Sequence, residues 1–182
     1  MKNLIAIAVL FLSISLSAQQ YVDKKGMAHF FSAATVENIE ATTHSAVCAL
    51  NTSTKRVVAK IPVTSFVFPD KLMQEHFNEN YLESDKYAYA SLDGTISEPI
   101  DFTKDGTYDV TIKGTFDIHN VKVNKEVKGK LTIKNGVPVS ALAKFDVKLA
   151  DHKIKIPSLL GANIAESEAV NVEFNFEKYE KK

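Results

Sequence analysis

Four successive segments from residue 107 onward alternate between apolar and polar side chains. Successive side chains of a β-strand point to opposite faces, so a period of two residues is typical of a strand with one buried face. The apolar positions are Tyr108, Val110, Ile112, Gly114, Phe116 and Ile118; Val127, Gly129, Leu131 and Ile133; Val137, Val139, Ala141, Ala143, Phe145, Val147 and Leu149; and Val170, Val172, Phe174 and Phe176. The pattern predicts long strands that each have one buried face and one solvent-exposed face.

Turn-forming dipeptides separate these segments at Asp105-Gly106, Asn135-Gly136 and Asp151-His152. The Asn-Gly pair favours a type I′ hairpin, because this turn needs a positive φ at both central residues. Shorter apolar alternations precede them, at Ala28 and Phe30 and at Val57, Ala59, Ile61 and Val63. Long strands joined by tight hairpins favour a closed up-and-down barrel over two stacked sheets. The predicted fold class is all-β, an antiparallel β-barrel of about eight strands with one short helix.

The short helix is expected at residues 70–80. Asp70 follows a proline and precedes the apolar residues Leu72, Met73 and Phe77. An aspartate in this position is a typical N-cap, and the apolar spacing predicts an amphipathic helix of about two to three turns. The helix is one candidate cover for a barrel mouth. The apolar pair Leu159-Leu160 is another, and it could equally fill the barrel as core.

The amino-acid sequence around this helix resembles that of the YceI-like family of secreted, lipocalin-like barrels. The segment Tyr87 to Leu92 resembles the family's "YP-x-A-x-F" strand. Phe116 to Asn120 and Lys125 to Val127 resemble its "LTIHG-V-T-K-x-V" strand pair, and residues 145–164 resemble its late "F-x-V…IP…IA" block. The resemblance covers most of the chain after the N-terminal segment.

The chain departs from the family pattern at two motif positions. Ala88 stands where the family has proline, and Asn120 where it has glycine. About two extra residues also lie between His119 and Lys125. The resemblance implies a lipocalin-like barrel that binds a polyisoprenoid or a similar long apolar molecule.

Small residues occupy several apolar positions of the predicted barrel. Gly114, Gly129, Ala141 and Ala143 stand where a filled core favours Leu or Ile, which predicts a void. A glycine can instead mark a bend or a close approach between strands. The residues expected to line an apolar cavity and bind its ligand are Phe30, Ile61, Val63, Phe66, Phe77, Tyr81, Tyr108, Val110, Ile112, Phe116, Leu131, Ala141, Ala143, Phe145, Val172 and Phe174.

The N-terminal residues 1–18 have the organisation of a secretory signal peptide. Lys2 precedes an apolar run from Leu4 to Leu12, and small residues follow it up to Ala18. Cleavage is expected after Ser17 or Ala18, which leaves residues 19–182 as one lipid-binding domain in the periplasm or outside the cell. No later segment reaches the length of apolar sequence that a transmembrane helix needs, so none is predicted.

Charge and side-chain chemistry exclude several classes of function. The sequence has 22 basic and 22 acidic residues, which gives no electrostatic reason to expect a nucleic-acid partner. Cys48 is the single cysteine and is expected to be a half-buried strand residue with no disulfide. The five histidines lack zinc-site spacing, and G-x-S-x-G is absent. We therefore predict no catalytic residue, no metal and no cofactor beyond a bound lipid. His76 and His119 are expected to fix loops or to hydrogen-bond a ligand headgroup.

The sequence predicts non-enzymatic binding or carriage of a long lipophilic small molecule, such as a polyisoprenoid, an isoprenoid quinone or a similar lipid. Two alternatives stay open at this point. The barrel could use a bound quinone-like molecule as a redox cofactor, or it could be a structural, stress-protective protein with a filled core. Whether the protein forms a homodimer is also open.

Overall fold

The computed structural model describes residues 19–33, 38–155 and 165–180. The predicted signal peptide at 1–18 and the apolar pair Leu159-Leu160 lie outside these residues. The strands within the described part are β1 Gln20–Ser32, β2 Ile39–Asn51, β3 Arg56–Pro62, β4 Tyr89–Ile96, β5 Gly106–Ile118, β6 Val121–Lys134, β7 Val137–Lys148, β8 Ser167–Asn175 and β9 Glu177–Lys178. The α-helix α1 spans Lys71–His76, and the short helical turns are η1 Val63–Ser65, η2 Phe77–Tyr81 and η3 Leu149–His152.

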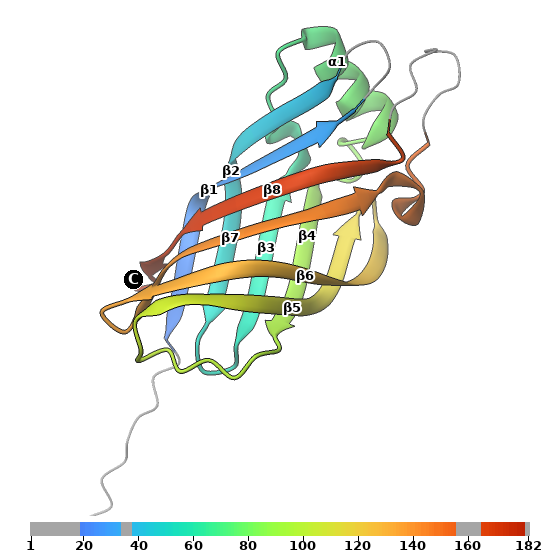
Figure 1. Cartoon of the computed structure of the whole chain (residues 1–182). Helices are drawn as coiled ribbons and strands as arrows, with labels where there is room; N and C mark the ends of the chain where they lie inside the picture. Colours follow the sequence, from blue (N-terminus) through green and yellow to red (C-terminus); the bar gives the residue numbers. More distant parts are fainter. Residues whose placement is uncertain (1–18, 34–37, 156–164, 181–182) are drawn as a thin grey trace, which may run out of the picture.

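The strands form one closed antiparallel barrel. Strands β2 to β8 pair in sequence order, and β1 pairs with both β8 and β2, which closes the ring of eight strands. Figure 1 shows β5 to β8 crossing one side of the barrel and β1 to β4 the other. The short β9 adds an edge pair to β1. Closure leaves the long strands no free edge, and the predicted antiparallel barrel with one short helix is confirmed.

Two-residue turns set the register of the long strands after residue 106. Asn135 and Gly136 have φ values of 53° and 70°, so the predicted type I′ turn is confirmed between β6 and β7. His119 and Asn120 have φ values of 53° and 56° and connect β5 to β6 in the same way. The third predicted turn, Asp151-His152, is instead the end of η3.

The helix lies across one end of the barrel (Figure 1). Asp70 is its N-cap, because the Asp70 carboxylate accepts a hydrogen bond of 2.7 Å from the Met73 backbone N–H. Helix α1 is shorter than the predicted span and continues directly into the wider turn η2. The Phe77 ring lies 5.5 Å from the Phe30 ring and 4.9 Å from the Phe68 ring. These aromatic contacts fasten the helix to the barrel end.

Candidate ligand-binding cavity

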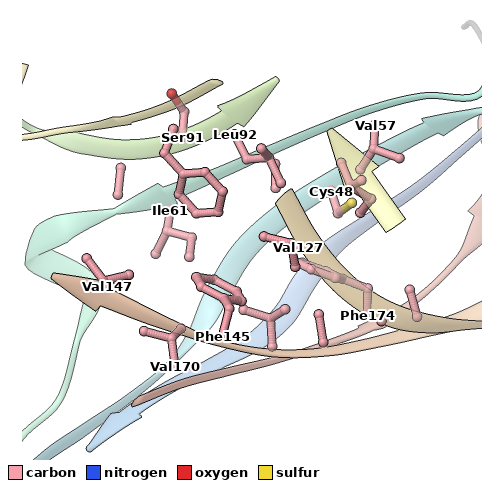
Figure 2. Close-up of a pocket in the computed structure, with 18 of the residues that line it drawn as sticks. Cys48, Val57, Ile61, Ser91, Leu92, Val127, Phe145, Val147, Val170 and Phe174 are labelled. Carbon is pink, nitrogen blue, oxygen red and sulfur yellow. The ribbon is translucent and has the colours of Figure 1, made fainter. Parts of the chain in front are cut away.

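An apolar cavity of about 210 Å³ runs through the interior of the barrel. A cavity of roughly 150 Å³ already admits benzene, so this one has room for a larger hydrocarbon. Figure 2 shows side chains from different strands converging on the same space, among them Ile61, Val127 and Phe145. Each strand from β1 to β8 contributes at least one lining residue: Phe30, Cys48, Val57, Leu92, Val110, Leu131, Ala143 and Val172.

The structure places all but two of the predicted ligand-binding residues around this cavity. Those that line it are Phe30, Ile61, Val63, Phe66, Phe77, Val110, Ile112, Phe116, Leu131, Ala141, Ala143, Phe145, Val172 and Phe174. Their contact with a ligand stays a prediction. The alternation brings them together because the inward positions of antiparallel neighbours stand side by side in the closed barrel.

Tyr81 and Tyr108 do not line the cavity. Tyr81 is buried in a separate small cluster with Val63, Leu82 and Ile154. Tyr108 is near the start of β5, and its hydroxyl donates a hydrogen bond of 2.9 Å to the Lys104 backbone oxygen. The sequence period identifies the face of a strand, but it does not identify the distance of a residue from the barrel end.

The small inward residues divide into two groups. Ala141 and Ala143 line the cavity, and so does Gly129. Gly114 does not, because it faces Gly94 across the β4–β5 pair, where a Cβ at Gly114 would lie 2.4 Å from the Asp93 backbone oxygen. A Cβ at Gly129 would also lie 2.6 Å from the Leu142 backbone oxygen. The expected void at Gly114 is therefore replaced by a close approach of two strands, which only glycine permits.

Comparison with known proteins identifies the family of this barrel. A model of the YceI-like domain matches residues 17–178. The chain belongs to the YceI-like family. No curated protein matches it.

Solved structures similar to this YceI-like chain share its fold at low sequence identity. A polyisoprenoid-binding domain from Saccharophagus degradans, implicated in plant cell wall breakdown, is 14% identical with a TM-score of 0.68, over 89% of this chain and 99% of that one. BcnA from Burkholderia cenocepacia is 13% identical with a TM-score of 0.63, over 84% and 96%. The YceI protein of Campylobacter jejuni is 15% identical with a TM-score of 0.56, over 98% and 94%.

Strand β2 supplies lining residues that the sequence alternation did not single out. Cys48 on this strand is 2% exposed, so the expectation of a half-buried cysteine is corrected to a fully buried one. Burial and then the nearby Asp23 charge raise the pKa of its thiol to about 12. The thiol is thus protonated and unreactive at neutral pH. Small and hydroxyl-bearing residues in β2, such as Thr43 and Ala46, weaken the hydrophobic signal that would have marked this strand.

Glu168 is the acidic residue that lines the cavity. It precedes Val170, Val172 and Phe174 at the same period of two, so the alternation of β8 already places it on the inward face. Glu168 is 8% exposed, and burial raises the pKa of its carboxyl to about 6. Within the described ranges its Oε2 atom has no hydrogen-bond partner. The sequence interpretation missed it because it followed apolar residues alone.

His119 fixes the β5–β6 turn to the helical end of the barrel. Its Nδ1 lies 3.2 Å from the His152 backbone oxygen, and its Nε2 lies 3.0 Å from Glu83 Oε2. Both neighbours are acceptors, so both hydrogen bonds form together only on a protonated ring. Lys86 first, and then His119, lowers the pKa of the Glu83 carboxyl. His119 is absent from the cavity lining. Of the two predicted roles, its contacts therefore favour fixing of a loop over hydrogen bonding to a ligand headgroup.

The described ranges lack two kinds of feature. They contain no group of three or more His, Cys, Asp or Glu side chains placed to hold a metal ion. They also contain no helix long and apolar enough to cross a membrane.

Proposed function

We propose that this protein binds a long apolar molecule, such as a polyisoprenoid, an isoprenoid quinone or a similar lipid, inside its barrel without transforming it. The observation that carries the proposal is the apolar cavity of about 210 Å³ lined by all eight strands. It disfavours the alternative of a filled core. The similar Saccharophagus degradans domain, described as polyisoprenoid-binding, adds support.

The energetics of the cavity favour hydrocarbon chains. Burial of each CH₂ group contributes about 0.8 kcal/mol, so one five-carbon isoprene unit supplies up to about 4 kcal/mol before ordering costs. Affinity can therefore come from chain burial, with few directed polar contacts. The ionisable residues of the lining are Cys48, Lys130 and Glu168. Lys130 belongs to the outer surface, where its ammonium lies 2.7 Å from the Asp109 carboxylate.

We also propose that the protein acts after export, as a periplasmic or secreted carrier. The support is the sequence of residues 1–18, with its charged start, apolar run and small residues before the expected cleavage position. Intact-mass measurement of the protein from its native host should show loss of residues 1–17 or 1–18. Soluble cytoplasmic protein that keeps Met1 would contradict this proposal.

The direct test of binding is mass spectrometry of an organic extract of protein purified from its native host. We expect a stoichiometric long-chain lipid. The Ala143→Phe variant places a ring in the cavity and should co-purify without it, whereas Lys144→Phe adds the same ring on the outer face and should retain it. Parent protein that is free of lipid and binds no added prenyl lipid would overturn the proposed function.

A further inference from the structure

Four buried side-chain atoms of the described residues have no hydrogen-bond partner, and all lie toward the helical end of the barrel. They are Ser32 Oγ, Asn78 Oδ1, Tyr81 Oη and Glu168 Oε2. Ser32 ends β1 and Glu168 is at the start of β8, which Figure 1 shows beside α1. Unpaired buried polar atoms are rare in folded proteins, and each needs a physical explanation.

Ser32 and Glu168 form a polar pair at this end of an otherwise apolar cavity. Phe31 of β1 pairs with Ala169 of β8, so the next position along places Ser32 beside Glu168. Ser32 is 1% exposed, and its hydroxyl partly offsets the raised pKa of the Glu168 carboxyl. No charged side chain of the described residues contributes to that shift. Among the described residues, the carboxyl therefore has no counter-ion, and its Oε2 atom has no hydrogen-bond partner.

A buried carboxyl in this state destabilises the protein unless something binds to it. Burial of a polar group without a hydrogen bond costs roughly 1–3 kcal/mol on mutational evidence, and an ionised group costs more. Core packing alone would favour an apolar residue here, in phase with Val170 and Val172. The position is thus suited to a ligand that carries a polar group at one end of a hydrocarbon chain.

We propose that Glu168 anchors the ligand headgroup and selects chains that end in a hydrogen-bond donor, such as a primary alcohol. This inference rests on the proposed function, since it names the ligand class of the same cavity. The carboxylate accepts a hydrogen bond from the headgroup hydroxyl, and Ser32 lies beside this carboxylate on the paired strand β1. The hydrocarbon chain then extends past Val170 and Phe145 into the barrel.

The proposal makes a distinction among chains of equal length. An alcohol can donate to Glu168, but its methyl ether cannot. An ionised carboxylic acid is repelled, because it would place a second negative charge in a cavity of low polarity. A hydrogen bond to a charged group contributes enough that removing its donor should weaken binding by about tenfold or more.

The test measures dissociation constants of farnesol, farnesyl methyl ether and farnesoic acid at pH 7.5 by displacement of a fluorescent apolar probe. The proteins are the delipidated parent, Glu168→Gln, Glu168→Leu and the control Glu173→Gln, which removes the same charge from an exposed position of β8. We expect the parent and Glu173→Gln to bind the alcohol about tenfold or more tightly than the ether. Glu168→Leu should bind both equally, and Glu168→Gln should gain affinity for the acid.

The possible results distinguish failure of the Glu168 headgroup anchor from failure of ligand binding in the cavity. Equal binding of alcohol and ether by the folded parent would overturn the anchor and leave the proposed function intact. An alcohol preference that survives in Glu168→Leu would also overturn it. If the parent binds none of the three chains, both the proposed function and the anchor fail. Glu168→Gln keeps the side-chain shape. Its affinity for farnesoic acid therefore tests the charge of Glu168 even if Glu168→Leu does not fold.

Discussion

The two ends of the barrel differ in how their buried side chains are satisfied. The end away from α1 holds Leu50, Leu131 and Ile133, each at most 2% exposed, and Leu50 and Leu131 pack in the main apolar cluster. The helical end holds the unpaired polar atoms of Ser32, Tyr81 and Glu168. The first arrangement maximises stability, whereas the second leaves polar groups available to a ligand. We infer that the end away from α1 contributes stability through apolar packing alone, whereas the helical end combines apolar packing with unpaired polar atoms that supply selectivity.

Filling the cavity between the two ends should have the largest effect on binding. Ala143→Phe adds a ring where the structure has open space, so bound lipid should be lost almost completely while the thermal midpoint of delipidated protein stays nearly unchanged. Overpacking of an already full core would instead cost about 1–3 kcal/mol. A clearly lowered midpoint, together with a lipid-free parent, would show that Ala143 is ordinary core.

Truncation at the apolar end should have the largest effect on stability. Leu131→Ala removes a fully buried side chain from the cavity floor and should lower the free energy of unfolding by about 2–5 kcal/mol. Urea denaturation of delipidated protein measures the change. Leu142→Ala, on the exposed face of β7, is the matched control and should change stability little. Equal losses of unfolding free energy for the two variants would show that this buried end contributes no more to stability than the exposed face of β7.

Neutralisation at the helical end should raise stability, in a pH-dependent way. Burial raises the folded-state pKa of Glu168 to about 6, above the ordinary glutamate value of 4.5, so the folded state binds this proton more tightly. The free energy of unfolding of the parent therefore falls as pH rises from 4.5 to 6 and levels off above that range. Glu168→Gln should be more stable than the parent by about 1–2 kcal/mol at pH 7.5 and equal to it at pH 4.

Denaturation of delipidated Glu168→Gln and Glu173→Gln at the two pH values measures this difference. Glu173 is exposed to solvent, so its variant should have the stability of the parent at both pH values. A Glu168→Gln variant that is less stable at pH 7.5 would show that the carboxylate has a stabilising partner within the protein.

The smallest expected effect is at the cap of the short helix. Asp70→Ala removes the acceptor for the Met73 backbone N–H and should cost about 1 kcal/mol. Asp70→Asn keeps an acceptor and should restore most of the loss. Amide exchange should accelerate in α1 and η2 while β6 and β7 stay protected, because the barrel closes without the helix. Uniform acceleration across the strands would show that the two ends unfold as one unit.

Much of the fold could be predicted because it depends on local patterns. The period of two after residue 107 identified the inward faces of β5 to β8, and Asn135-Gly136 identified a hairpin by its backbone tolerance. Asp70 marked the helix start in the same local way. Strand β2 was less visible, since its inward side chains, including Thr43, Ala46 and Cys48, are small or polar and gain their burial from neighbouring strands.

The sequence by itself therefore determined which face of each long strand is buried and where the main hairpin turns. It also determined that the long strands bury these faces by closing into a barrel. The tertiary structure decided what stands opposite each residue. Gly114 faces Gly94 of the neighbouring strand β4, Tyr108 lies near a strand end, and Glu168 lies beside Ser32 of a strand more than a hundred residues away. Alternation is a property of one strand, whereas voids, close approaches and unpaired charges depend on register and closure, which exist only once all the strands are assembled.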